Sequence, residues 1–389
     1  MALATRLQKA SAEQVPVDIT INLKTLQFQS ALTEEEKELI CLRARSHALT
    51  VFACAQATYL VSILNEARQM RTRLKMPKKP SARILSDRES LDPVKVGILG
   101  CGRLGSQLAH CFLTFGNINP KDIIISTRRP EILENLINKG VDCFHDNIKL
   151  VTTSHIVFLC VLPSQIPAVA EEVKNHIPQT LFFYSFASSC PTKKLVQMFG
   201  TFNIIKPDFV CSEENKNSEW DYSSNVSMAL EHKEFILKTC PLAPKTDCVV
   251  SVPEKLAELI IFMLTNMCTH LKMNRQETLD MIHKVMFPTA KTDLLLQQEF
   301  VKMTSTEESE TFPLFNLLKI LDKNTAVLKK LKQSPTLRQA FVDKYCHIFE
   351  ETKKVHFEDI QDVKLKLVPL FLQKEVDRYF PRFQKLRKI

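Results

Sequence analysis

Residues 94–116 read Val-Lys-Val-Gly-Ile-Leu-Gly-Cys-Gly-Arg-Leu-Gly-Ser-Gln-Leu-Ala-His-Cys-Phe-Leu-Thr-Phe-Gly, and this stretch decides the fold. Its first six residues are mostly apolar, as a buried parallel strand requires. Gly100, Gly102 and Gly105 then stand at G-x-G-x-x-G spacing. Apolar side chains follow at helical intervals, at Leu104, Leu108, Cys111 and Phe112. The stretch therefore predicts a strand, a glycine turn and an amphipathic helix.

The three glycines of this turn have separate physical roles. Gly100 permits the tight turn, Gly102 lets a pyrophosphate approach the backbone, and Gly105 lets the helix lie close to the strand. The first N–H groups of the helix, at Arg103 and Leu104, point toward the phosphates. The chain has only seven glycines, and four of them are in residues 97–105. This concentration favours a dinucleotide site over the alternative, an ordinary glycine turn that binds nothing.

Composition limits the class of protein. A chain of 389 residues is long enough for about two domains with extensions. The net charge of +9 comes from scattered basic residues, which favours anionic ligands such as nucleotides, and no nucleic-acid-binding motif accompanies it. Twelve cysteines without a C-x-x-C pair predict reduced thiols and no metal site.

The N-terminal residues bear on location. The first residues lack the apolar core of a secretory signal, so we expect a cytoplasmic protein. Arg6 and Lys9 among alanines leave a mitochondrial presequence as the weaker alternative.

Residues 1–92 are predicted to be an N-terminal extension. Thr33 and Glu36 form a capping-box pattern that begins a long helix, which ends near residue 76. The middle of this helix, residues 47–64, is apolar but short and contains polar side chains. We therefore expect it to pack on the nucleotide domain or on a second copy, with no stable membrane insertion. A basic linker follows over residues 68–83.

Residues 93–230 alternate between strand and helix patterns. The predicted strands are residues 94–99, 123–126, 141–144, 156–162, 181–187 and 203–206, with residues 226–230 as a last strand. Strands that alternate with helices predict an α/β fold with a doubly wound parallel sheet of the Rossmann type.

Residues 231–389 are predicted to be an all-helical domain for packing and homodimer formation. Apolar residues recur at helical spacing from Pro253 onward, and Asn274 with Glu277 caps one helix. Further helices are predicted at residues 289–300, 313–331, 335–354 and 367–389. The last of these is basic and amphipathic, so it is either a docking helix or a helix on an anionic membrane surface.

The end of the second strand predicts which cofactor binds. An acidic residue at this place binds the ribose hydroxyls of NAD, whereas arginines accommodate the 2′-phosphate of NADP. Here the strand ends in Ser126, Thr127, Arg128 and Arg129, without an acid. The sequence therefore predicts NADP(H) over NAD(H), and the alternative is that both arginines belong to a solvated helix start.

Residues 96–105, 126–130 and 158–163 together resemble the pyrroline-5-carboxylate reductase family, as a divergent relative. The resemblance covers about residues 94–290. It implies a Rossmann domain followed by a helical domain that pairs between subunits. It also implies that Val161, Leu162 and Pro163 lie beside the nicotinamide, with residues 184–188 near the same ring. Leu162 stands where the family has Lys, and the glycine loops of its helical domain have no counterpart after Gly200.

The expected activity follows from these features. We expect an NADP-dependent oxidoreductase acting on CH–NH or CH–OH donors, with hydride transfer to an unidentified small carbonyl or imine. No catalytic residue is assigned, and Ser185, Ser188 and Lys206 are the candidates near the nicotinamide. The alternative is a non-catalytic NADP-binding pseudoenzyme or scaffold.

Overall fold

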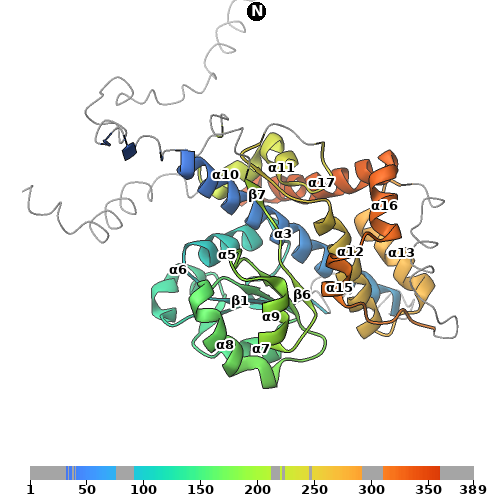
Figure 1. The fold of residues 1–389 in the computed structure, drawn as a ribbon, viewed down its shortest axis with the longest axis horizontal. Coiled ribbons are helices and arrows are strands. Elements are labelled where there is room, and N and C mark those ends of the chain that lie inside the picture. The colour runs from blue at the N-terminus through green and yellow to red at the C-terminus, as the bar shows by residue number, and fades with distance from the viewer. Residues whose placement is uncertain are drawn as a thin grey trace, which may run out of the picture.

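A six-stranded parallel sheet forms the centre of the nucleotide-binding region (Figure 1). The computed structural model describes residues 41–75, 92–211, 224–244, 248–290 and 310–359, with a few single positions between and before them. The strands run in the order β3-β2-β1-β4-β5-β6. Their bounds are β1 Val96–Leu99, β2 Ile123–Ser126, β3 Asp142–Phe144, β4 Ile156–Leu159, β5 Phe182–Ser185 and β6 Ile204–Ile205. All six strands predicted for this sheet are present.

The connecting helices cover both faces of the sheet. α5 (Arg103–Phe115) and the short α6 (Glu134–Ile137) pack on one face, where their apolar side chains join a large core with Ile98, Phe158 and Tyr184. The other face is covered by α7 (Asn147–Thr153), α8 (Ile166–Val173) and α9 (Thr192–Phe199). Successive connections therefore change face between β1 and β4, which is the doubly wound arrangement expected from the sequence.

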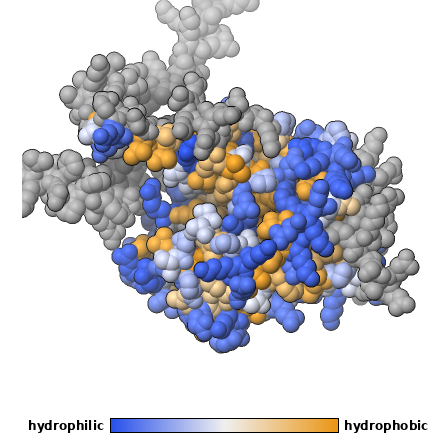
Figure 2. Space-filling model, in the orientation of Figure 1, coloured by the Kyte–Doolittle hydropathy of each residue, from blue (hydrophilic) through white to orange (hydrophobic). Residues whose placement is uncertain are grey.

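Helix α3 (Cys41–Lys75) is a core helix. It contacts α5 on one side and α10, α11, α13 and α17 on the others, and Figure 1 shows it in blue between the sheet and the C-terminal helices. Its length and composition would suit a membrane span, but 78% of its apolar stretch is buried within the protein. The contact of α3 with α5 confirms the expected packing on the nucleotide domain. On the face of the protein drawn in Figure 2, hydrophilic side chains interrupt the apolar areas.

The C-terminal half of the described chain is mainly helical. Its helices are α10 (Val226–Glu231), α11 (Lys233–Thr239), α12 (Lys255–His270), α13 (Arg275–Met286), α15 (Leu317–Leu321), α16 (Ala326–Gln333) and α17 (Pro335–Asp359). A small antiparallel pair, β7 (Val210–Cys211) and β8 (Val250–Ser251), lies beside them. The reciprocal capping boxes predicted at Thr33–Glu36 and Asn274–Glu277 are both formed.

Two predictions for this half are wrong. Residues 226–230 do not close the sheet but form α10, because the Asn225 side chain accepts from the Met228 N–H and begins a helix. Residues 313–331 are not one helix, since the chain turns after Leu321 and Thr325 caps α16. The helices predicted at 289–300 and 367–389 lie almost wholly or wholly outside the described residues.

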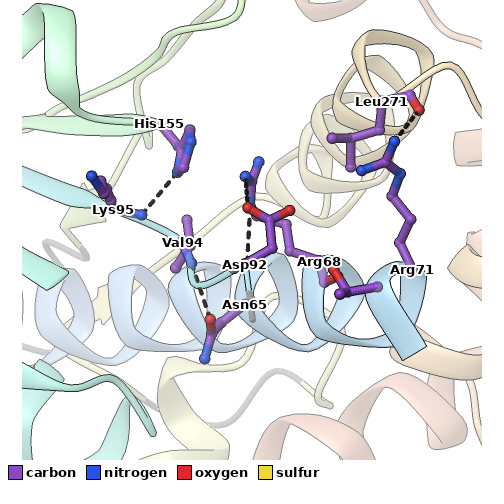
Figure 3. A network of polar contacts seen from close by, with 9 residues as sticks. Asn65, Arg68, Arg71, Asp92, Val94, Lys95, His155 and Leu271 are labelled. Atoms are coloured by element: carbon purple, nitrogen blue, oxygen red, sulfur yellow. Dashed lines mark hydrogen bonds and ion pairs between the residues drawn. The ribbon is translucent and has the colours of Figure 1, made fainter. Parts of the chain in front are cut away.

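A polar network joins α3 to the start of β1 (Figure 3). The Asn65 carboxamide accepts from the Val94 N–H at 3.1 Å and donates to the Asn117 carbonyl at 3.0 Å. Arg68 pairs with Asp92 at 2.5 Å. Beyond it, Arg71 donates to the Leu271 carbonyl at 2.9 Å, so one helix face is tied to both halves of the molecule.

His155 completes this network at the amino ends of the strands. Its Nδ1 accepts from the Lys95 N–H at 2.9 Å, so the ring is neutral at that nitrogen. Burial, reinforced by the nearby Arg68 charge, lowers the pKa of His155 to about 4. The ring therefore stays a hydrogen-bond acceptor at neutral pH.

We expect Asn65→Ala to lower the free energy of unfolding by about 2 kcal/mol, because it leaves the buried Val94 N–H without its acceptor. Urea unfolding of the full chain measures this change. Arg73→Ala, at an exposed position near the end of α3, is the control and should change stability by less than about 0.5 kcal/mol. Equal effects of the two variants would contradict a role for the Asn65 bridge.

Candidate functional site

The candidate site lies at the carboxyl ends of β1, β2 and β4. The Gly100 N–H donates to the Ser126 carbonyl at 2.9 Å, and the Cys160 N–H donates to the Leu99 carbonyl at 2.9 Å. These bonds hold the loops that follow the three strands at one edge of the sheet. The helices that follow β1 and β4 cover opposite faces, so the crevice between these loops is the topological switch point.

The glycine turn is close-packed on two sides and open on a third. Gly100 has φ +91°, and a Cβ there would lie 2.7 Å from Val161 Cγ1. A Cβ on Gly105 would collide with the Gly100 carbonyl oxygen. Gly102 is exposed, and a Cβ there would meet nothing within 4 Å. Of the three glycines in this turn, only Gly102 therefore has open space beside its backbone for a ligand.

Helix α5 begins directly at this open position. Gly102 is its N-cap and supplies no side-chain cap, and the first turn carries no acidic residue. The first N–H groups of a helix have no acceptor within it, so those at the start of α5 are available to an anion. Arg103 is exposed here and Leu104 is half-buried. Burial raises the pKa of the neighbouring Cys101 thiol to about 12, so this thiol adds no negative charge.

Ser126 at the end of β2 faces the protein interior. It is 1% exposed, and its hydroxyl donates to Asn147 Oδ1 at 2.7 Å and accepts from the Asp146 N–H at 3.3 Å. Asn147 in turn donates to Glu172 at 2.7 Å. The Ser126 side chain therefore holds the loop after β3. No sequence pattern predicts this pairing, since Asn147 lies 21 residues further along the chain.

The next three residues form the basic side of the site. The Thr127 N–H donates to the Phe144 carbonyl at 2.9 Å, which fixes this loop beside the end of β3. Arg128 and Arg129 are exposed and form no ion pair with any residue that the structure describes. Lys149 lies 3.9 Å from the centre of the Phe144 ring, but it pairs with Asp142 at 3.4 Å, so its charge is already balanced. This edge can therefore bind a phosphate dianion.

The loop after β4 supplies an apolar surface. Val161 is half-buried against Gly100, whereas Leu162 is 65% exposed and Pro163 is exposed. The Leu162 N–H is paired with the Gln165 carboxamide at 3.3 Å. The structure thus brings residues 161–163 to the same edge as residues 100–105 and 126–129.

The three candidate catalytic residues lie at the ends of β5 and β6. Ser185 is fully buried, and its hydroxyl accepts from the Ala187 N–H at 3.3 Å. Lys206 donates to the Ser188 carbonyl at 3.3 Å and pairs with Asp208 at 3.1 Å. Ser188 itself is exposed. Among the described residues, no group of histidine, cysteine or carboxylate side chains could hold a metal ion.

The sheet order, the glycine turn and the switch-point crevice define a Rossmann-type nucleotide-binding fold. Residues 95–182 match the family described as NADP oxidoreductase coenzyme F420-dependent. Over 370 residues the chain is 28% identical to NADP-dependent oxidoreductase domain-containing protein 1 of Mus musculus, covering 91% of this chain and 99% of that one. It is 30% identical over 129 residues to pyrroline-5-carboxylate reductase 3 of Danio rerio, covering 32% of this chain and 45% of that one.

Two solved structures also resemble this chain at low sequence identity. A pyrroline-5-carboxylate reductase from Coxiella burnetii is 15% identical, with coverage of 67% of this chain and 98% of that chain and a TM-score of 0.28. The Plasmodium falciparum pyrroline carboxylate reductase with NADP bound is 16% identical, with the same two coverages and a TM-score of 0.27. The sequence matches thus show that the chain is similar to pyrroline-5-carboxylate reductases, as its motifs indicated.

We expect Gly105→Ala to lower the free energy of unfolding by about 2 kcal/mol, because its Cβ would overlap the Gly100 carbonyl oxygen. Gly102→Ala is the matched control, since its Cβ has space and its φ of −81° suits alanine. Urea unfolding of both variants measures the difference. Equal stability would show that the turn is not packed as described.

Proposed function

We propose that this crevice binds NADP(H) and that the protein is an oxidoreductase. The pyrophosphate would lie at Gly100, Gly102 and the start of α5, and the 2′-phosphate would lie against Thr127, Arg128 and Arg129. The nicotinamide would lie beside residues 161–163. The space at Gly102 fits such a ligand, because a Cβ there would meet nothing within 4 Å, whereas neighbouring atoms fill that space at Gly100 and Gly105. The related proteins whose descriptions name NADP support the same cofactor.

The observation that carries this proposal is the pair of guanidinium groups at the end of β2, which are exposed and form no ion pair within the part of the chain that the structure describes. An acid there would accept from a ribose hydroxyl but repel a phosphate, and this chain has none. Two arginines give charge-assisted, bidentate donors to a phosphate dianion. The cofactor would supply the hydride for a small carbonyl or imine. The chain's own residues would hold the phosphates and place the nicotinamide against residues 161–163.

A second proposal, a protein that binds NADP(H) without turnover, has its own support. Ser185 uses its hydroxyl within the protein, and Leu162 presents only an apolar side chain. Lys206 is already held by Ser188 and Asp208. On this proposal none of these three side chains assists hydride transfer. A cytoplasmic location and a homodimer through the helical domain stay predictions.

We expect Arg128→Glu/Arg129→Glu to weaken NADPH binding by at least about 100-fold, because two charge-assisted contacts become repulsive. NADH binding should change by less than about threefold, and calorimetry with both cofactors measures each affinity. Lys329→Glu/Lys330→Glu in α16 makes the same change in charge at another place. If this control weakens NADPH binding equally, the effect is one of net charge and the assignment is wrong.

We expect NADPH oxidation when the purified full chain is mixed with a panel of imino acids, aldehydes and keto acids. Gly102→Val should abolish it, because a branched side chain would fill the space for the pyrophosphate while the turn itself stays intact. Absorbance of NADPH follows the reaction, and urea unfolding checks that the variant is folded. NADPH binding without oxidation of any substrate would favour the binding protein, and no binding would contradict both proposals.

A further inference from the structure

Three polar side chains link helix α8 to the end of β2, and we call them the Glu172 bridge: Glu172, Asn147 and Ser126. Asn147, the first residue of α7, donates from its Nδ2 to Glu172 Oε2 at 2.7 Å. Its Oδ1 accepts from the Ser126 hydroxyl at 2.7 Å. Helices α7 and α8 pack against each other, and α7 also contacts β2 (Figure 1). The bridge therefore lies on the face of the sheet that these two helices cover.

Glu172 determines which way the Asn147 carboxamide points. A carboxylate only accepts hydrogen bonds, so the Asn147 NH2 group turns toward Glu172 and the Asn147 oxygen is left facing Ser126. The Ser126 oxygen already accepts from the Asp146 N–H at 3.3 Å, and the one hydroxyl hydrogen goes to the Asn147 oxygen. The opposite orientation would place two donors, the amide NH2 and the Asp146 N–H, on the same hydroxyl. Each hydrogen bond of the bridge thus depends on the one before it.

The bridge ends where the basic loop of the candidate site begins. Ser126 is 1% exposed, so its side chain is fixed within the protein. The next residue is fixed through its backbone, because the Thr127 N–H donates to the Phe144 carbonyl at 2.9 Å. Arg128 and Arg129 follow directly and are exposed. The position of the backbone that carries both guanidinium groups therefore depends on these two ties.

We propose that Glu172 is a positioning residue for the 2′-phosphate of NADP(H), and this inference rests on the proposed function. Glu172 acts through Asn147 and Ser126 on the backbone that carries the two arginines. A bidentate contact between guanidinium and phosphate requires a fixed geometry. A loop already held in place therefore binds the phosphate more tightly than a loop that must be ordered on binding. NAD(H) has no 2′-phosphate, so its binding depends less on this loop.

The charge of Glu172 and its hydrogen bond act in opposite directions on a bound phosphate. A carboxylate repels a phosphate dianion, whereas the bond to Asn147 holds the loop that binds it. Glu172→Gln removes the charge but keeps an oxygen that accepts from Asn147, and Glu172→Ala removes both. Glu171→Ala is the matched control, because Glu171 is the preceding residue of α8 and pairs with Lys174 at 2.8 Å.

Calorimetry with NADPH and NADH compares these three variants with the parent protein. Glu172→Ala should weaken NADPH binding by about fivefold or more and change NADH binding by less than about twofold. Glu172→Gln and Glu171→Ala should bind NADPH within about twofold of the parent. Unchanged NADPH binding by Glu172→Ala, or an equal loss for both cofactors or in Glu171→Ala, overturns the proposal. Urea unfolding checks that each variant is folded.

Limited proteolysis without cofactor tests the positioning itself. Trypsin cleaves after arginine, and Arg128 is the site in this loop because Pro130 blocks cleavage after Arg129. Cleavage after Arg128 should be about threefold faster or more in Glu172→Ala than in the parent, since the loop opens more often. Glu172→Gln and Glu171→Ala should be cleaved at the parental rate.

The two measurements together separate this inference from the proposed function. If the parent binds NADPH but Glu172→Ala changes neither affinity nor cleavage, the positioning role alone is wrong. If cleavage changes as expected but the parent binds neither cofactor, the proposed function is wrong and the role toward the 2′-phosphate is wrong with it. Equal cleavage rates in all four proteins overturn the positioning of the loop by Glu172.

Discussion

The burial of α3 on all sides is the constraint on which the rest of the structure depends. A helix that is apolar around its whole circumference must be covered around its whole circumference. Here α5 covers one side, and α10, α11, α13 and α17 cover the others. One continuous core therefore runs from the sheet through α3 into the C-terminal helices. Helix α3 thus contributes side chains to the core of both regions.

The same helix fixes the orientation of the candidate site. The C-terminal end of α5 is tied to α3, because Ser62 donates to the Gly116 carbonyl at 3.4 Å and Asn65 donates to the Asn117 carbonyl. The N-terminal end of α5 presents its N–H groups at Gly102. A rigid helix anchored at one end points its other end in one direction. Helix α3 therefore helps to preorganise the proposed phosphate site through its contacts with the far end of α5.

Local patterns predicted the sheet well but not every element or contact. The strands and the glycine turn could be predicted because continuous apolar runs and closely spaced glycines have few other physical uses. Residues 226–230 were ambiguous, since a short apolar run suits a strand or a helix, and the Asn225 cap decided between them. The inward direction of Ser126 depends on Asn147, the first residue of α7. Such a pairing between a strand end and a later helix leaves no signal in either segment alone.

The two ends of the crevice differ in a way that separates binding from turnover. The phosphate end combines helix N–H groups, open space at Gly102 and two guanidiniums without an ion pair among the described residues, and on the proposed function all of these would bind the cofactor equally well before and during a reaction. Such uniform binding raises affinity but does not accelerate the chemical step. Acceleration requires a group that acts at the reacting atom. At that end the described residues offer Leu162, an occupied Ser185, a tethered Lys206 and the exposed Ser188. Recognition of the cofactor is therefore encoded in this chain more fully than its chemistry.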